Sequence, residues 1–424
     1  MTVSVRQVFR NVLRLGSGEM VARLCSIAII ILLGHRYGVL VVGVYSLGMT
    51  VAYYLQPVID FGLQHIGARL MAQYPQSATE IMHRVQRRRV LMAGAAVPLT
   101  LIYAWLAKLP MDMKVWLALF SATGTLYALS LDWAAWGREH LRLVGLSRAF
   151  VPCCILVAVV AAGRSSGKQV LWWALAGSAV GFLLQATVFR EWWDRHRPSD
   201  REAIENLKEV GDSLAWHRTS IMGVACISNL AFRSIDLLML GAMSNPEQVG
   251  LYSAAYRLLN QVLITFYLLT GVLYPQFARQ TIEDRVMMLR PRILLSLFGA
   301  GTILAAVLSV VRRDLLTLFF GHQFVAAAGL LFVLSWCLPL DFLAYYLSTA
   351  YIAWGMEKRF LLCTVVAAGS DIILNLIWIP VYGAKAAAVN TVISYVIFLT
   401  GLALAGRSAR ELVPKAQPHP EVVG

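Results

Sequence analysis

The chain has 424 residues, of which 58% are hydrophobic and only 14% are charged. This number of polar side chains is too small to cover the surface of a soluble protein of this length. The composition therefore excludes a soluble protein and predicts one that is embedded in a bilayer. The net charge of +14 is spread over many short segments, which indicates membrane topology and anionic headgroups rather than nucleic-acid binding.

Runs of about 20 mainly apolar residues, the length needed to cross ~30 Å of hydrocarbon, recur along the whole chain. We place such spans at residues 12–34, 39–62, 90–107, 115–136, 149–163, 169–189, 213–241, 250–275, 293–311, 325–350, 360–379 and 386–406. The sequence therefore predicts an all-α integral membrane protein with about twelve transmembrane helices.

Lys and Arg are distributed unequally between the two sets of loops. If the N-terminus is inside, the inner segments collect about 24 of the 37 Lys and Arg, including Arg84, Arg87, Arg88 and Arg89, and the outer loops collect about 8. Because basic loops are retained in the cytoplasm, both termini are expected there. The most highly charged stretch, 190–212, separates the sixth and seventh spans.

A short phrase occurs twice, as VGVYS at Val42–Ser46 and as VGLYS at Val249–Ser253. Weak internal similarity of this kind is typical of transporters built from two related halves. The expected organisation is an N-terminal six-helix half at 1–189, a cytoplasmic linker at 190–212, a C-terminal six-helix half at 213–406 and a cytoplasmic tail at 407–424.

The chain lacks the motifs of most enzyme classes. It has no Walker-type phosphate loop, no HExxH and no GxSxG, and its six cysteines all fall inside predicted spans. We therefore expect no ATP site, no metal, no cofactor and no enzymatic activity. The expected outer loops are short and poor in acidic residues, which argues against a polysaccharide polymerase or ligase.

Ionisable residues inside the spans are the candidates for function, because each costs at least ~2.5–3.5 kcal/mol at mid-membrane. They are Arg14, Glu19, Arg23, Asp60, Asp132, Arg218, Arg233, Asp236, Arg257, Asp341 and Asp371. Glu19 and Arg23 are four residues apart, and Arg233 and Asp236 are three apart, so each couple could form an ion pair on one helix face. Arg23, Arg233 and Arg257 lie deep in their spans, and guanidinium is the side chain that best matches a phosphate.

Four phrases in order resemble the O-antigen and polysaccharide flippases, which belong to the multidrug/oligosaccharidyl-lipid/polysaccharide (MOP) exporter superfamily. They are YGVLVVGVYSLGMT from Tyr37, DLLMLGAMSNPEQVGLYSAAYRL from Asp236, AWGMEK from Ala353 and IWIPVYGAKAAAVNTVISYV from Ile377. The resemblance covers essentially the whole chain. Tyr395 stands where some members of the family have an acidic residue, which weakens the case for a coupling carboxylate in the last helix.

The resemblance implies a flippase that moves an undecaprenyl-pyrophosphate-linked oligosaccharide, for O-antigen or exopolysaccharide, across a bacterial inner membrane by alternating access. Its partners would be that lipid-linked glycan, membrane lipids, a polysaccharide polymerase and a chain-length regulator. Arg23, Arg233 and Arg257 would hold the pyrophosphate. Asn229, Asn260, Gln56 and Gln261 would contact sugars or bridge helices, and Glu19, Asp60, Asp132, Asp236, Asp341 and Asp371 would couple transport to an ion or proton or form ion pairs.

Three alternatives stay open at this point. A drug exporter of the same superfamily would share the fold, but its cationic cargo calls for an acidic cavity. A lipid II flippase would carry a similar headgroup, although the family usually has two further helices. A membrane polysaccharide polymerase or ligase is the alternative from the enzyme class.

Overall fold

A computed structural model describes residues 5–107, 109–163, 167–196, 214, 216–278, 291–354 and 356–411, in which every regular element is helical. Before the expected linker the elements are α1 (Val5–Asp60), α2 (Leu63–Gln73), η1 (Pro75–Ser77), α3 (Ala78–Leu106), α4 (Met111–Thr125), η2 (Leu126–Leu129), α5 (Asp132–Gly137), α6 (Leu141–Ser147), α7 (Phe150–Ala161) and α8 (Gln169–His196). After it they are α10 (Trp216–Met243), α11 (Pro246–Ala278), α13 (Pro291–Phe320), η4 (His322–Ala327), α14 (Ala328–Ser335), α15 (Cys337–Ala353), α16 (Glu357–Tyr382) and α17 (Ala384–Glu411). The all-α fold predicted from the sequence is confirmed.

Nine helices of the described residues are long and apolar enough to cross a membrane, and a tenth is added when His322–Ser335 and Cys337–Ile352 count as one bent span. The helix α1 contains the first two predicted spans. Its backbone turns at Gly38, where φ is 83° and ψ is −176°, and this turn divides α1 into two helical parts. Glycine adopts this conformation without the steric cost that other residues meet. The predicted span 250–275 lies within α11. These helices together correspond to the twelve expected spans.

Two of the expected spans are less regular than a single straight helix. The span 115–136 is divided between α4, the short η2 and α5. The span 325–350 bends by 43° at the break between its two helical parts. The helix α8 extends into the expected linker as far as His196. The rest of the expected linker, 197–212, lies outside the described residues. The expected tail is described only as far as Glu411.

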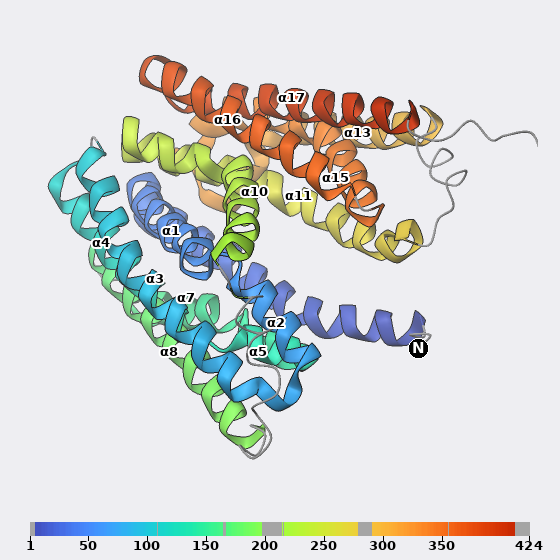
Figure 1. Cartoon of the computed structure of the whole chain (residues 1–424). Coiled ribbons are helices and arrows are strands. Elements are labelled where there is room, and N and C mark those ends of the chain that lie inside the picture. The colour runs from blue at the N-terminus through green and yellow to red at the C-terminus, as the bar shows by residue number, and fades with distance from the viewer. Residues whose placement is uncertain are drawn as a thin grey trace, which may run out of the picture.

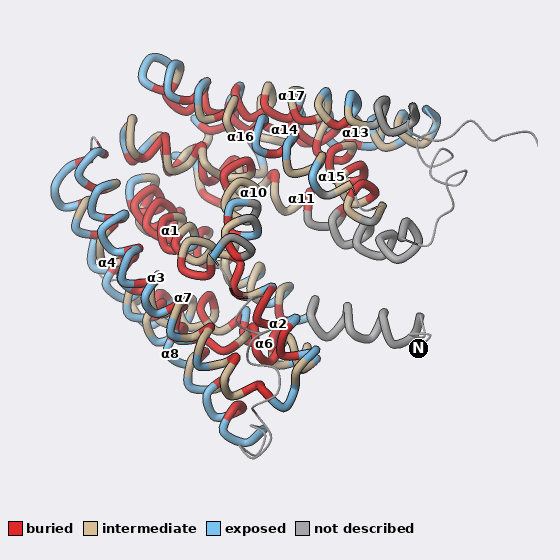
Figure 2. Tube along the Cα trace, viewed as in Figure 1, coloured by how far each residue is buried: buried red, intermediate tan, exposed pale blue. Residues whose placement is uncertain are grey.

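The helices are arranged as two arms that diverge in the view of Figure 1, one formed mainly by α3, α4, α7 and α8 and the other by α11, α13, α15, α16 and α17. The helix α1 contacts both, packing against α4 and α7 on one side and α10 and α11 on the other. Exposed residues follow the outer faces of the arms in Figure 2. Large apolar side chains are among the exposed residues of the protein, such as Trp105, with 77% of its surface exposed, and Val310, with 79%. Outward apolar side chains of this size suit contact with lipid.

The two copies of the repeated phrase meet where α1 packs on the start of α11. A Cβ atom added to Gly43 would overlap the carbonyl oxygen of Pro246 and lie 3.2 Å from the backbone nitrogen of Gly250. A Cβ atom added to Gly250 would overlap the carbonyl oxygen of Val39. Small residues allow membrane helices to approach backbone to backbone, so these glycines hold the two helices together near Gly38.

Candidate functional site

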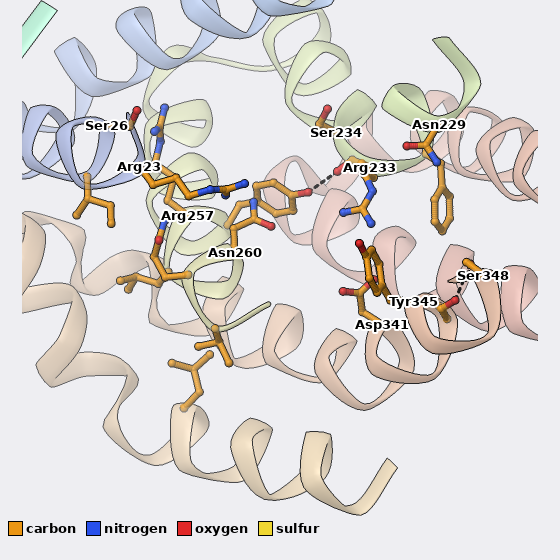
Figure 3. A pocket seen from close by; sticks show the side chains of 18 of the residues that line it. Arg23, Ser26, Asn229, Arg233, Ser234, Arg257, Asn260, Asp341, Tyr345 and Ser348 are labelled. Atoms are coloured by element: carbon orange, nitrogen blue, oxygen red, sulfur yellow. Dashed lines mark hydrogen bonds between the residues drawn. The ribbon is translucent and has the colours of Figure 1, made fainter. Parts of the chain in front are cut away.

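A cavity of about 960 Å³ lies between α1 and the helices of the second arm. Its walls come from α1, α10, α11, α13, α15, α16 and α17. Arg23, Arg233 and Arg257 all line the cavity, each from a different helix (Figure 3). Asp341 is the one carboxylate among the described lining residues. Three arginines against one carboxylate give the lining an excess of positive charge.

Arg233 and Arg257 lie at a similar depth along their helices, and Arg23 lies about one turn further from the turn at Gly38. Arg233 is 10 residues before the end of α10, and Arg257 is 11 residues after the start of α11. At 1.5 Å per residue these spacings place them ~15–17 Å from the ends of the helices. Arg23 is 15 residues before the turn at Gly38, or ~22 Å. All three arginines therefore lie well inside their helices and away from the helix ends.

Each arginine has a distinct environment. Arg23 Nη2 is 2.6 Å from Glu19 Oε1, and Glu19 also lies 3.1 Å from Arg148 Nη1, so the predicted pair exists within a small charge network. Arg23 Nε is nevertheless buried without a hydrogen-bond partner. The Arg233 guanidinium lies 6.0 Å from the ring centre of Tyr345, consistent with a cation–π contact. Among the described contacts, the Arg257 side chain has no ion pair.

Amide and hydroxyl groups extend the polar part of the cavity. Asn229, Asn260 and Gln261 line it, together with Ser26, Tyr345, Ser348 and Thr349. Figure 3 shows Asn229 and Asn260 near Arg233 and Arg257, respectively. Gln56, which the sequence grouped with these amides, is not among the lining residues. The arrangement can offer several hydrogen bonds to a hydroxyl-rich molecule.

One side of the cavity is apolar. Ile27 and Ile30 of α1 contribute to the lining, as do Leu308, Leu315 and Phe319 of α13. These residues make the lining contributed by α13 and by Ile27 and Ile30 of α1 apolar. Arg233 and Arg257 lie on α10 and α11, and Arg23 lies about one turn before Ile27 on α1. A single molecule with an anionic head and an apolar tail would match both parts.

Asp60 and Asp132 lie in a different cluster, around the fully buried Arg89 of α3. Arg89 Nε is 3.5 Å from Asp60 Oδ1, and Arg89 Nη1 is 3.9 Å from Asp132 Oδ1. Arg89 Nη1 also donates to the carbonyl oxygen of Ser130 at 2.5 Å. The sequence had placed Arg89 in a cytoplasmic basic group before a span at 90–107, but α3 begins at Ala78 and carries Arg89 into the protein. Its cation satisfies carbonyl groups freed where the span breaks at η2.

Asp236 and Asp371 belong to a third, buried polar cluster between α10, α11, α16 and α17. Asn375 Nδ2 donates to Asp236 Oδ1 at 2.6 Å and to Asp371 Oδ2 at 3.1 Å, so one amide bridges both carboxyl groups. Hydroxyl groups complete the set: Tyr252 and Thr391 each donate to Asp236 at 3.0 Å, and Ser394 donates to Asp371 at 2.8 Å. Asp236 thus points away from the predicted pairing with Arg233 and into this cluster.

The two carboxyl groups have hydroxyl and amide partners but no cation within 4.0 Å among the described residues. Burying two ionised carboxylates side by side is costly, because like charges repel and burial disfavours the charged form. The cluster is therefore suited to hold a proton or a small cation. The side chains of Arg14 and Arg218, two further candidates from the sequence, lie outside the described residues.

The fold and the charged cavity define a polytopic membrane transporter. Residues 8–280 match the family described as polysaccharide biosynthesis protein, and the chain belongs to this family. The resemblance to polysaccharide flippases of the MOP superfamily is thereby confirmed. No curated protein matches the sequence significantly.

Solved structures show the same fold at low sequence identity. The lipid II flippase MurJ, in an inward closed conformation, matches with a TM-score of 0.71 at 14% identity, covering 93% of this chain and 87% of that chain. An inward-facing multidrug resistance transporter of the MATE family matches with a TM-score of 0.67 at 12% identity, covering 96% and 100%. A MOP superfamily transporter from Pyrococcus furiosus, described as having a binding pocket of reverse polarity, matches with a TM-score of 0.59 at 13% identity, covering 95% of each chain.

Proposed function

We propose that the protein is a flippase that moves an undecaprenyl-pyrophosphate-linked oligosaccharide, for O-antigen, lipopolysaccharide or exopolysaccharide, from the inner to the outer leaflet of a bacterial inner membrane. The observation that carries the proposal is the convergence of Arg23, Arg233 and Arg257 on one cavity. A pyrophosphate offers oxygen pairs that guanidinium groups bind bidentately. Neither the phosphates nor the sugars can cross hydrocarbon unaided.

The cavity accounts for each chemical part of this cargo. The arginines would hold the pyrophosphate, and Asn229, Asn260 and Gln261 would bind sugar hydroxyls. The apolar wall of α1 and α13 would keep the polyprenyl chain next to the lipid phase. A cationic drug would be repelled by three arginines, so the charge of the lining favours a flippase over a drug exporter. Lipid II shares the pyrophosphate, and the family match favours a polysaccharide precursor instead.

Transport would proceed by alternating access between the two arms, with residues 1–189 and 213–406 as the moving halves. The tight contact of Gly43 with Pro246 and Gly250 would close the outer side in the conformation described. The buried Asp236 and Asp371 would couple this motion to an ion or proton gradient. The cavity would then be loaded from the cytoplasmic side, where the precursor is made.

The most direct genetic test is complementation of a bacterial strain that lacks its own flippase and accumulates the lipid-linked repeat unit. The intact chain should restore surface polysaccharide when its cognate repeat unit is supplied. If the repeat unit remains on the inner leaflet while the protein is present in the membrane, the proposed function is wrong. A polymerase would instead lengthen a repeat unit that had already reached the outer leaflet.

The proposed orientation places both termini and residues 190–212 in the cytoplasm. Alkaline phosphatase fused after residue 424 should be inactive, because this enzyme becomes active only in the periplasm. Green fluorescent protein at the same position should fluoresce, because it folds in the cytoplasm and does not fluoresce when it is exported unfolded to the periplasm. A phosphatase fusion at Gly167, in an expected outer loop, provides the opposite control. An active phosphatase at the C-terminus would reverse the orientation and the proposed loading side.

We expect Gly43→Val to force α1 and α11 apart at their outer contact, because the new side chain would overlap the Pro246 carbonyl group. Spin labels are placed at the exposed Leu40 and Asn245 in a background without the native cysteines. In Gly43→Val the distance between the two labels should be longer than in the wild type, and the fraction of molecules in the closed state should be smaller. Gly94→Val is the matched control, since a Cβ atom at Gly94 meets nothing within 4 Å. An unchanged distance in Gly43→Val would show that the glycine contact does not close the outer side.

A further inference from the structure

A second cavity, of about 730 Å³, lies between α3 and α8 in the first arm and shares no lining residue with the arginine cavity. Both helices pack against η2, and Leu129 and Leu131 from that region line the cavity. The other lining residues belong to the first part of α3 and the last part of α8. With the N-terminus inside, this region lies at the level of the inner leaflet.

The basic residues of this cavity lack the ion pairs of their neighbours. Arg84 pairs with Glu80 at 2.5 Å on α3, and Arg195 pairs with Glu191 on α8. Arg87 and Arg190, which line the cavity from the same two helices, form no ion pair among the described residues. Asp194 is the carboxylate in the lining, so Arg87 and Arg190 leave a net positive charge there. His83 also lines the cavity and would add a donor.

Two polar atoms of the lining are buried without a hydrogen-bond partner. They are Thr79 Oγ1 and Gln86 Oε1. The Gln86 orientation is fixed because its Nε2 donates to the carbonyl oxygen of Ala128. The buried oxygen of this amide therefore still requires a donor, such as a hydroxyl group. Buried polar groups are nearly always satisfied in native proteins, so each of these atoms is expected to be paired by a ligand or by an ordered water molecule.

The rest of the cavity faces hydrocarbon. Val90, Leu91 and Leu183 line it and are 47%, 61% and 46% exposed, respectively. They lie one or two helical turns deeper in the membrane than Arg87 and Arg190. Trp193, which also lines the cavity, is of the residue type enriched at the headgroup level. Basic groups above an apolar wall reproduce the order of groups in a phospholipid.

We propose that this cavity binds one anionic phospholipid of the inner leaflet, of the phosphatidylglycerol class. The phosphate would lie between Arg87 and Arg190, a headgroup hydroxyl would donate to Gln86, and an acyl chain would follow Val90, Leu91 and Leu183. Basic pockets between membrane helices on the cytoplasmic side recognise anionic headgroups in this way. The lipid would fill the space between α3 and α8 and hold these helices of the first arm together.

The test is native mass spectrometry of the purified full chain titrated with dioleoyl phosphatidylglycerol or dioleoyl phosphatidylcholine. The wild type should retain one phosphatidylglycerol with higher affinity than phosphatidylcholine. Replacing both Arg87 and Arg190 by alanine should weaken binding of that lipid roughly 30-fold, since each basic residue contributes about a fivefold factor. Arg84→Ala with Arg195→Ala removes the same charge outside the cavity and should leave the retained lipid in place.

Thermal unfolding followed by intrinsic fluorescence gives a second readout. Phosphatidylglycerol should raise the Tm of the wild type and of the Arg84/Arg195 variant, and should not raise that of the Arg87/Arg190 variant. Equal retention of both lipids by the wild type, or equal loss in the two double variants, would overturn the proposal. Preferential retention of undecaprenyl phosphate over phosphatidylglycerol at this site would also overturn it, because it would assign the cavity to a polyprenyl lipid.

Discussion

Arg257→Ala should abolish export of the lipid-linked oligosaccharide while leaving the protein folded in the membrane. Arg257 lines the arginine cavity and has no ion pair among the described residues, so its loss leaves no orphaned carboxylate behind. A charge-assisted hydrogen bond is worth ~1.5–3 kcal/mol, and a bidentate contact forms two of them. Two such bonds are worth ~3–6 kcal/mol, so the transport rate should fall by at least about a hundredfold, which abolishes measurable export. Arg257→Lys should restore part of the rate, because it keeps the charge and loses the planar fork.

Transport is measured as surface polysaccharide in the complemented strain, with membrane levels of each variant compared by immunoblot. Arg313→Ala, which removes an exposed arginine from α13 outside the cavity lining, is the matched control and should transport normally. Arg23 needs a further control, because it pairs with Glu19. If Glu19→Gln restores Arg23→Ala, then Arg23 acts through that ion pair. Normal export by Arg257→Ala would contradict a pyrophosphate site at this position.

Asp371→Asn should uncouple transport from its driving gradient. Asp236 and Asp371 share the Asn375 amide, with no cation within 4.0 Å among the described residues, so a proton or a small cation must compensate their charge. An amide at position 371 removes one charge and the site for that ion. Gradient-driven transport in proteoliposomes should fall at least about tenfold, while exchange without a gradient persists. The buried charge is costly, so the variant should unfold at the same temperature as the wild type or higher.

The measurement compares imposed proton and sodium gradients in proteoliposomes containing wild type, Asp371→Asn or Asp112→Asn. Asp112 pairs with Lys168 near the start of α4 and is exposed, so its loss should leave the response to both gradients unchanged. ATP should have no effect on any of the three proteins. Full gradient response by Asp371→Asn would exclude this cluster as the coupling site, and ATP-driven transport by the chain alone would exclude gradient coupling altogether.

The sequence predicts the fold well because hydrocarbon restricts it so strongly. Length and apolar composition are enough to place the spans, and no other backbone structure is compatible with them. Helix breaks are harder to predict. The turn at Gly38 falls between two predicted spans, but the division of α4 from α5 depends on a tertiary partner, Arg89, which binds the Ser130 carbonyl group. A basic run that reads as a loop can therefore belong to a buried helix.

The sequence singles out the arginines and three of the amides that line the arginine cavity, but not the neutral partners of Asp236 and Asp371. The cost of burying an arginine singles out Arg23, Arg233 and Arg257 in the sequence. Asn375, Thr391 and Ser394 carry no such signal, since neutral polar residues are common in membrane helices. Their role around Asp236 and Asp371 becomes visible only when α10, α16 and α17 are packed together. The spacing of carboxylates along the chain does not show which of them share a site.

The charge of the cavity bears more directly on the cargo of this chain than the fold does. Structures of a lipid II flippase and of multidrug transporters have the same architecture at 12–14% identity. The fold alone therefore does not select the cargo. The three arginines that line the cavity, with apolar residues of α1 and α13 beside them, favour a lipid-linked anion.

The most direct measurement is flipping by the purified chain in proteoliposomes that contain a fluorescent undecaprenyl-pyrophosphate-linked oligosaccharide in both leaflets. A membrane-impermeant quencher bleaches only the outer leaflet at first. The account predicts that wild-type protein makes nearly all of the fluorescence accessible, and that Arg257→Ala leaves about half protected, as in protein-free vesicles. Half protection with the wild type under every imposed gradient, or full access with Arg257→Ala, would contradict it.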